Sequence, residues 1–235
     1  MCLMHMIPRG KRLSEKGYPT ISLFSGVGGL DLGLSKAGFK PYILLDKDLY
    51  CCKSLELNRE KYWKECKKII KGKIEDFTVS EMLQMAGLNK GEIALVSGGP
   101  PCQPFSKSAF WSPNRWSDGK AIRPENGKSR SADSFKGLED PRSGLLLKFV
   151  SFIREAQPVA YIIENVKGLS YKTSKPMLDL VLKSLRESGY TINPQILNAV
   201  DYGVPQKRER LFIIGTREGL ELEFPKPNHF SQSML

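Results

Sequence analysis

Thr20-Ile21-Ser22-Leu23-Phe24-Ser25-Gly26-Val27-Gly28-Gly29-Leu30-Asp31-Leu32-Gly33 is the stretch of sequence that decides the fold. Thr20–Phe24 alternates like a strand, and the glycines after it allow a tight turn. Leu30, Leu34 and Ala37 then share one helical face, and Gly38 suits the end of that helix. A strand, a glycine turn and a helix make the first unit of a nucleotide-binding α/β fold, in which the backbone approaches a ligand closely.

A second strand follows and ends in an acid. Tyr42–Leu45 is apolar, and Asp46 comes directly after it, at a spacing from Gly26 that lets a carboxylate accept hydrogen bonds from ribose hydroxyls. The pattern fits the dinucleotide fingerprint poorly, because Asp31 stands where the last glycine of that fingerprint belongs. The alternative role for Asp46 is structural, as the N-cap of a helix over Lys47–Asn58.

Composition limits the class of protein. The 235 residues, 40% hydrophobic and 26% charged, are enough for one sizeable core of an ordinary globular protein. No apolar run approaches the length of a membrane span, and Met1–Ile7 is too short for a signal peptide. Five cysteines without a Cys-x-x-Cys pair, and only two histidines, argue against both a disulfide framework and a metal site. We therefore expect a protein of a reducing compartment with no metal.

The charge of the chain indicates its partner. A net charge of +11 and a pI near 9.4 favour a polyanionic partner, and the alternative is simply a solvated basic surface. Residues 1–18 are basic and show no periodicity, so we interpret them as an N-terminal arm.

Ser97-Gly98-Gly99-Pro100-Pro101-Cys102-Gln103-Pro104-Phe105-Ser106 is chemically unusual. It follows the apolar run Ile93–Val96, which is typical of a buried strand. Glycines and prolines fix the backbone and hold one thiol, Cys102, beyond the carboxyl end of that strand, where open α/β sheets bind ligands. The alternative is that Cys102 is a small buried hydrophobe.

Charged residues also follow the later strands. Val159–Ile163 runs directly into Glu164, and a carboxylate there is costly to bury without a partner, so we expect it to face a ligand. Tyr190–Ala199 and Leu211–Gly215 read as strands around the decamer Asp201–Arg210, which in isolation would be taken for a charged turn.

Residues 107–139 form a long segment without periodicity. The segment is basic and carries Trp111 and Trp116, which could wedge against bases or stack on them. So long a segment inside a compact domain indicates a functional loop, and the alternative is an insertion with no role.

Three of these pieces together resemble the DNA cytosine-5 methyltransferase family. Gly98–Ser106 resembles its catalytic loop, Phe24–Leu30 its S-adenosylmethionine loop, and Asp201–Arg210 a family signature almost residue for residue. The resemblance extends from Ile21 to His229. It implies an α/β fold with a doubly wound, mostly parallel sheet of the S-adenosylmethionine-dependent methyltransferase type and a C-terminal antiparallel hairpin.

The same resemblance implies S-adenosylmethionine as the cofactor and S-adenosylhomocysteine as its product. The positions that it assigns to cofactor binding are Phe24, Ser25, Gly26, Gly28, Gly29, Leu30, Asp46, Lys47, Ile74, Pro100 and Leu145. The chain departs from the family at one point, because Lys73-Ile74 stands where relatives have Asp-Ile, whose acid meets the adenine amino group. Either the acid has moved to Glu75 or Asp76, or adenine is held by Ile74 and the backbone alone.

The catalytic roles that the resemblance implies are also specific. Cys102 adds to carbon 6 of cytosine, which makes carbon 5 nucleophilic enough to accept the methyl group. Glu164 hydrogen-bonds ring nitrogen 3 and the amino group, and Arg210 holds the ring carbonyl oxygen. Arg208 and Gln206 position the backbone or the loop. The base must leave the DNA stack to reach such a pocket.

The resemblance also indicates which parts of a complete family member this chain contains. Residues 19–235 are expected to be the catalytic domain, with 107–139 as its active-site loop, while the target-recognition region and the terminal motifs of the family are absent. The expected partner is double-stranded DNA with a flipped-out cytosine, together with a missing C-terminal region or a second polypeptide that carries recognition. We expect a restriction-modification methylase of the bacterial cytoplasm, associated with the nucleoid. The alternatives are a tRNA cytosine-5 methyltransferase and a non-catalytic nucleic-acid-binding module with the same fold.

Overall fold

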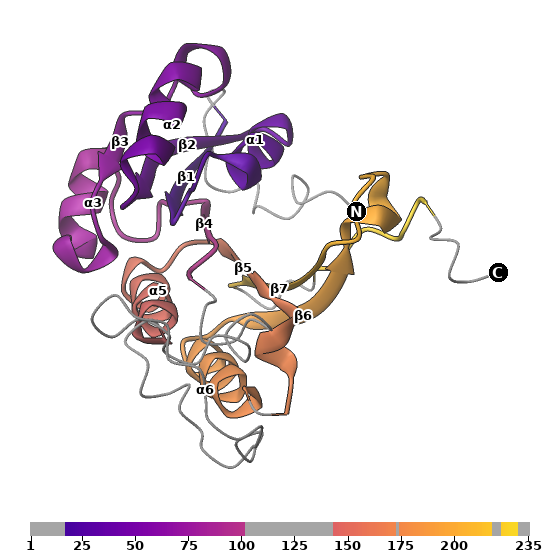
Figure 1. The fold of residues 1–235 in the computed structure, drawn as a ribbon. Coiled ribbons are helices and arrows are strands. Elements are labelled where there is room, and N and C mark those ends of the chain that lie inside the picture. The colour runs from indigo at the N-terminus through magenta and orange to yellow at the C-terminus, as the bar shows by residue number, and fades with distance from the viewer. Residues whose placement is uncertain (1–16, 102–142, 173, 218–221, 230–235) are drawn as a thin grey trace, which may run out of the picture.

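The computed structural model describes residues 17–101, 143–172, 174–217 and 222–229. Figure 1 shows strands and helices alternating along these residues. The elements are β1 (Tyr18–Leu23), α1 (Gly29–Lys36), β2 (Phe39–Asp46), α2 (Leu49–Tyr62), β3 (Lys68–Lys71), η2 (Ile74–Asp76), α3 (Val79–Ala86), β4 (Leu95–Gly98), α5 (Ser143–Ala156), β5 (Ala160–Val166), η4 (Lys167–Ser170), α6 (Lys175–Arg186), β6 (Thr191–Asn198), η5 (Ala199–Tyr202) and β7 (Glu209–Thr216).

One sheet of seven strands, counted over the described residues, organises the molecule in the order β3-β2-β1-β4-β5-β7-β6. The first five strands of that order are parallel, and β7 runs antiparallel between β5 and β6. Helices follow β1, β2, β3 and β4, as crossovers between parallel strands require. The doubly wound α/β class with a C-terminal antiparallel hairpin, predicted from the sequence, is confirmed.

Alternate residues along each strand face different helical layers. Ile21 and Leu23 of β1 belong to the main buried cluster, together with side chains of α3, α5 and α6 such as Phe149. On the opposite face, Leu44 of β2 packs with Leu55 and with Trp63 beyond α2. The period-two alternation in the sequence therefore places apolar side chains on both faces of a sheet that is covered on both sides.

Several element boundaries differ from the sequence expectation, among them those of β1, α2 and β5. Tyr18, assigned to the arm, is the first residue of β1, because its N–H donates to the carbonyl of Gly38 and its ring packs 5.5 Å from that of Phe39. Helix α2 begins at Leu49 and not at Lys47. Strand β5 continues past Ile163 through Val166, because β7 pairs with it along its whole length.

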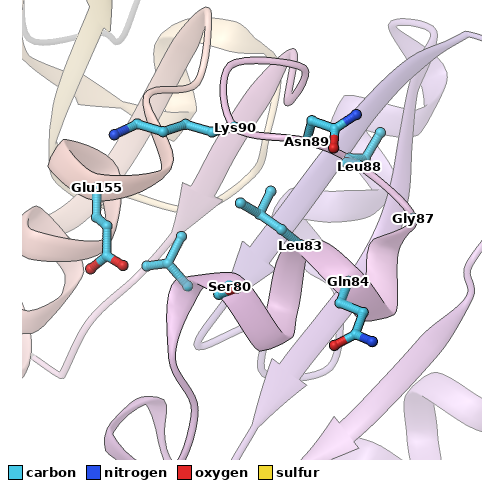
Figure 2. A pocket seen from close by; sticks show the side chains of 9 residues that line it. Ser80, Leu83, Gln84, Gly87, Leu88, Asn89, Lys90 and Glu155 are labelled. Atoms are coloured by element: carbon cyan, nitrogen blue, oxygen red, sulfur yellow. The ribbon is translucent and has the colours of Figure 1, made fainter.

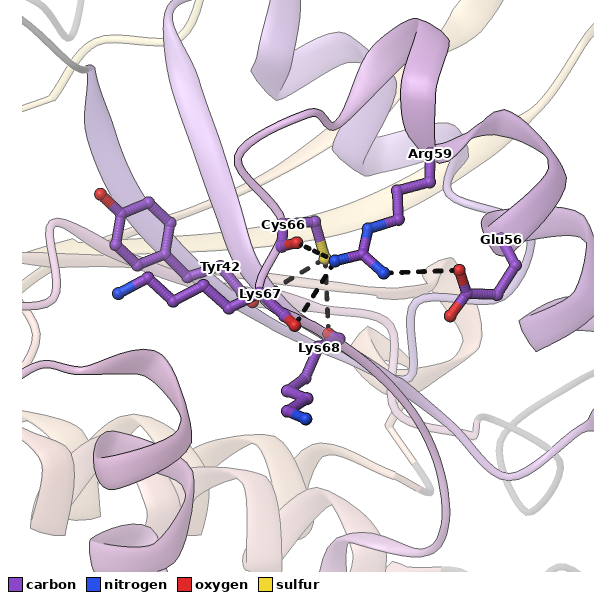
Figure 3. A network of polar contacts seen from close by, with 6 residues as sticks. All are labelled: Tyr42, Glu56, Arg59, Cys66, Lys67 and Lys68. Carbon is purple, nitrogen blue, oxygen red and sulfur yellow. Dashed lines mark hydrogen bonds and ion pairs between the residues drawn. The ribbon is translucent and has the colours of Figure 1, made fainter.

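Helix α2 and edge strand β3 are joined by a network of polar contacts (Figure 3). The guanidinium of Arg59 donates to the carbonyl oxygen of Cys66 at 2.6 Å and pairs with Glu56 at 3.7 Å. The Cys66 thiol donates to the carbonyl oxygen of Lys68 at 3.4 Å, and burial raises the pKa of that thiol to about 11. These contacts fix the turn that brings β3 alongside β2.

The segment 222–229 returns along the β6–β7 hairpin. The backbone N–H groups of Asn228 and His229 both donate to the carbonyl of Asp201, and the Tyr202 hydroxyl donates to the carbonyl of Pro225. No helix within the described ranges is long and apolar enough to cross a membrane.

Candidate active site

The glycine turn after β1 is held by backbone bonds and by close packing. Gly26 and Gly28 have φ values of 56° and 84°, a backbone conformation that favours glycine. A Cβ at Gly28 would lie 2.5 Å from the ring of Trp63, so no larger residue fits there. The Ser25 N–H donates to the Leu45 carbonyl at 3.0 Å, which joins the turn to β2. These contacts join the turn to β2 and pack it against Trp63.

Asp46 closes this turn from the end of β2. Its Oδ2 accepts the Gly26 N–H at 2.8 Å, and its Oδ1 accepts the Asp48 N–H at 2.8 Å. The N-cap interpretation of Asp46 is wrong, because Asp48 caps α2 by accepting the N–H groups of Tyr50 and Cys51. A carboxylate has about four acceptor positions, so Asp46 retains capacity for hydroxyl donors.

The residues around this turn fit an adenosine-bearing cofactor. The space that a Cβ would occupy at Gly26 and at Gly29 is open, which leaves room for a ligand against the backbone. Of the other predicted positions, Lys47 is exposed, Leu30 is half-buried, and Ile74 is only 5% exposed because it packs into the main core. Phe24 and Leu145 are partly buried against the same core.

The third strand leads to the position where the sequence departs from the family. Lys73 is exposed, and its N–H donates to Asp76 Oδ2 at 2.9 Å, so Asp76 caps the short η2 helix. Glu75, the other acid considered for the adenine amino group, is exposed. Which group meets adenine therefore stays a prediction.

The loop after β4 is tightly packed where it leaves the sheet. A Cβ at Gly98 would lie 2.0 Å from the carbonyl oxygen of Leu23, so only glycine fits between the ends of β1 and β4. Asn165 of β5 is 1% exposed, and its side-chain amide donates to the carbonyl of Pro100 at 3.4 Å. Sequence reasoning missed Asn165, although an amide directly after Glu164 at a strand end was a visible signal.

Several predicted features lie outside the described residues. They are Cys102, the segment 107–139 with its two tryptophans, and residues 1–16 of the arm. Pro101 is the last described residue before Cys102.

Glu164 and two arginines meet where β5 and β7 run side by side. The Arg210 Nε lies 2.9 Å from Glu164 Oε1, and Arg208 Nη2 lies 3.9 Å from the same oxygen. The side chains of Glu164 and Arg210 are 27% and 24% exposed, whereas that of Arg208 is 47% exposed. A Cβ at Gly99 would lie 3.0 Å from Oε2, so the carboxylate faces the loop that leads to Cys102.

The remaining predicted residue of this group stands apart. Gln206 is exposed on the connection between η5 and β7, with its N–H bonded to the carbonyl of Val204. Beside the arginines, Lys167 donates to Glu209 at 2.7 Å, which raises the pKa of Lys167. No cluster of histidine, cysteine and acidic side chains suited to a metal occurs in the described part of the chain.

A separate pocket of about 700 Å³ has none of these residues in its lining (Figure 2). It is lined by α3, by the segment after it and by Glu155 near the end of α5, on the side where β4 and β5 begin. Ligands of open α/β sheets bind at the carboxyl ends of the strands, so this pocket is not the candidate site.

The sheet order, the glycine turn and the acid after β2 define an α/β protein whose candidate site lies at the carboxyl ends of its parallel strands. The family described as C-5 cytosine-specific DNA methylase matches residues 18–115 and 127–234. The chain belongs to this family.

Relatives and solved structures agree with this assignment. The chain is 36% identical over 217 residues to the type II methyltransferase M.AquIA of Picosynechococcus, covering 89% of this chain and 76% of the relative. It is 35% identical over 227 residues to M.SacI of Streptomyces achromogenes, covering 92% and 52%. A crystal structure described as a prophage-encoded DNA modification methyltransferase of E. coli shares the fold, with a TM-score of 0.65, 24% identity and coverage of 88% and 49%. Apart from M.AquIA, the chain spans about half the length of these proteins.

Proposed function

We propose that this chain transfers a methyl group from S-adenosylmethionine to carbon 5 of cytosine in duplex DNA, as the modification enzyme of a restriction-modification system. Family membership and the type II relatives support the reaction class. The observation that carries the proposal is the Glu164–Arg210 pair, which faces the loop that begins at Gly99.

Each residue has a part in this chemistry. The Cys102 sulfur adds as the thiolate to carbon 6 of the flipped cytosine, and the displaced electron pair makes carbon 5 the nucleophile. Glu164 binds the edge of the ring and Arg210 binds its carbonyl oxygen, so both stabilise the charge that develops there. After methyl transfer a base removes the carbon 5 proton, the double bond reforms and Cys102 leaves.

Cofactor binding is assigned to the other end of the site. Bound S-adenosylmethionine supplies the electrophilic methyl group. The backbone of Ser25–Gly29 lies against it, and the remaining acceptor capacity of Asp46 receives the ribose hydroxyls. Because this loop and the Glu164 pair lie at the same edge of the sheet, the two substrates can meet over the loop after β4.

Target recognition is proposed to reside outside these 235 residues. Reading a DNA sequence requires side chains that reach base edges from an element in a groove. The matched region covers 52% of M.SacI but 76% of M.AquIA, so the part of the relatives beyond this region differs in length. A further region of the same protein or a second polypeptide would supply recognition.

The test is methylation in cells that express the gene together with its genomic neighbours, followed by bisulfite sequencing of host DNA and tRNA. Cys102→Ser should abolish DNA methylation, while Cys51→Ser should leave it intact. Burial and the carboxylates of Asp46 and Asp48 raise the pKa of the Cys51 thiol, which makes it a poor nucleophile. Methylation by Cys102→Ser would overturn the mechanism, and methylation of tRNA alone would overturn the substrate.

A further inference from the structure

A group of buried polar side chains beneath the glycine turn is not used by the proposed chemistry. Asp31, in the first turn of α1, is 1% exposed, and neither of its carboxylate oxygens makes a hydrogen bond of normal geometry within the described ranges, although the Ser22 hydroxyl lies close enough to influence it. Ser97 of β4 is 0% exposed, and its hydroxyl also has no partner there. An ionised carboxyl without a partner is costly to bury, so its presence at this position needs a physical reason.

Ser22 connects Asp31 to the cofactor turn. The parallel register places Ser22 of β1 beside Ser97 of β4. The Ser25 hydroxyl, which begins the turn, donates to Ser22 Oγ at 3.0 Å and also lies 3.2 Å from the Ser22 carbonyl oxygen, a second acceptor for the same hydrogen. Since Ser22 Oγ is the acceptor in that bond, its own hydrogen remains available to a second acceptor, and Asp31 is the acid that lies near it.

Burial, and not a neighbouring charge, dominates the pKa of Asp31. Burial raises the pKa of Asp31 to about 6, although the Ser22 hydroxyl lowers it. No charged side chain is among the causes of that shift. Among the described residues, the Cys66 thiol, which follows α2, is also influenced by the Asp31 charge, and its own pKa of about 11 keeps it neutral between pH 5 and 8. Asp31 is therefore the group of the cluster whose charge changes near neutral pH.

We propose that Asp31 is a positioning residue whose ionised carboxylate accepts the Ser22 hydroxyl and thereby holds Ser25 and the glycine turn in the conformation that receives the cofactor. The donation from Ser25 to Ser22 is the 3.0 Å bond of the structure, and the donation from Ser22 to Asp31 is the bond that ionisation of Asp31 would form. Ser97 lies beside this chain, on the strand that leads into the loop of Cys102. The inference rests on the proposed cofactor-binding role of the turn.

Two effects of opposite sign follow. The folded protein binds the Asp31 proton more tightly than the unfolded chain does, so folding stability falls as pH rises from about 4 to about 6. Cofactor affinity should instead rise as pH passes through about 6, because the ionised acid completes the chain of hydrogen bonds. A buried acid with a purely structural role would change stability with pH and leave cofactor affinity unchanged.

The experiment is calorimetric titration of the purified 235-residue chain with S-adenosylhomocysteine between pH 5.5 and 8, with thermal melting at each pH. The affinity of the wild-type chain should rise by roughly three- to tenfold over this pH range. A tenfold rise corresponds to a decrease of one unit in the pKa of Asp31 when the ligand binds. Asp31→Asn should flatten that rise and melt no lower than wild type above pH 6. Ser22→Ala, which removes the middle hydroxyl, should flatten it with Asp31 still present.

Ser35→Ala is the matched control. Ser35 also has a buried hydroxyl without a partner in the described structure, but it lies one turn further along α1, away from both loops. Its variant should keep the wild-type pH dependence of affinity.

The outcomes separate the two proposals. A pH-dependent affinity that persists in Asp31→Asn or in Ser22→Ala would overturn the positioning role, as would an Asp31→Asn variant that does not fold. If the wild-type chain does not bind S-adenosylhomocysteine, the proposed cofactor role fails. In that case, hydrogen exchange of the backbone amides from Ser25 to Gly28 tests the role of Asp31. After correction for intrinsic rates, these amides should exchange more slowly above pH 6 in wild type but not in Asp31→Asn. Equal exchange in the two proteins would overturn the positioning role.

Discussion

The cofactor turn and the Glu164 pair lie at the same edge of one sheet, but different interactions hold them in place. The turn is fixed by residues close in sequence, through backbone bonds and glycine conformations, and Asp46 reaches back only 20 positions to Gly26. Glu164 is held by a charge on β7, a strand inserted from a later part of the chain. The first region is held mainly by contacts of its backbone, whereas the second depends on a side-chain pair.

The largest expected effect tests the backbone side of this comparison. Gly98→Ala would place a Cβ 2.0 Å from the Leu23 carbonyl oxygen, and neither backbone segment can yield easily. We expect a loss of about 3 kcal/mol in the free energy of unfolding, measured by urea denaturation. Gly144→Ala, where a Cβ meets no atom within 4 Å, is the control and should not destabilise. Equal stability of the two variants would show that the ends of β1 and β4 are not packed as described.

Substitutions at the Glu164–Arg210 pair should lower activity and leave the stability of the fold almost unchanged. Arg210→Met should lower methyl transfer by about 10²-fold, as expected when a group that stabilises developing charge is removed. Arg208→Met should have a much smaller effect, because Arg208 lies 3.9 Å from Glu164 and is about half exposed. Rates from the complete enzyme on plasmid DNA would measure both. Similar losses in the two variants would contradict the unequal roles.

Asp46→Asn tests whether the carboxylate beside the cofactor turn contributes to cofactor binding. The variant keeps the shape of the side chain but replaces one acceptor oxygen, so the bond to the Gly26 N–H or to the Asp48 N–H weakens. Cofactor binding should weaken by about 1–3 kcal/mol, as measured by calorimetry with S-adenosylhomocysteine. Asp179→Asn, on the exposed side of α6, should bind normally. Unchanged affinity in Asp46→Asn would leave Asp46 as a purely structural link between the turn and α2.

The smallest effect is expected at the neighbouring pair of Lys167 and Glu209. Its hydrogen bond raises the pKa of Lys167, so any contribution to stability is present at neutral pH and is lost as pH rises through that raised pKa. Both side chains are more than a third exposed, and exposed pairs contribute little. Lys167→Met should melt almost as wild type does at pH 7, and any difference should vanish at high pH. A marked loss at pH 7 would mean that this pair, and not Arg210 alone, supports the second region.

Local pattern predicted much of this architecture from the sequence. The strand, glycine turn and acid were recognisable because their constraints act within a few residues. The extension of β5 through Glu164 was not, because it depends on pairing with β7, which no local period reveals. Asp31 was missed for a related reason: an acid in the first turn of a helix is ordinarily favoured by the helix dipole and faces solvent, whereas here α1 buries it and leaves Ala37 exposed.

The position of β7 between β5 and β6 has a consequence for synthesis of the chain. The N-terminal residues emerge from the ribosome first. Strands β1 to β4, with the cofactor turn between β1 and α1, are complete by Gly98. Arg210 reaches Glu164 only when β7 inserts antiparallel beside β5. We expect a nascent or truncated chain to be able to form the cofactor turn while the base-binding pair is still missing, so that methylation begins only after almost the whole domain has emerged.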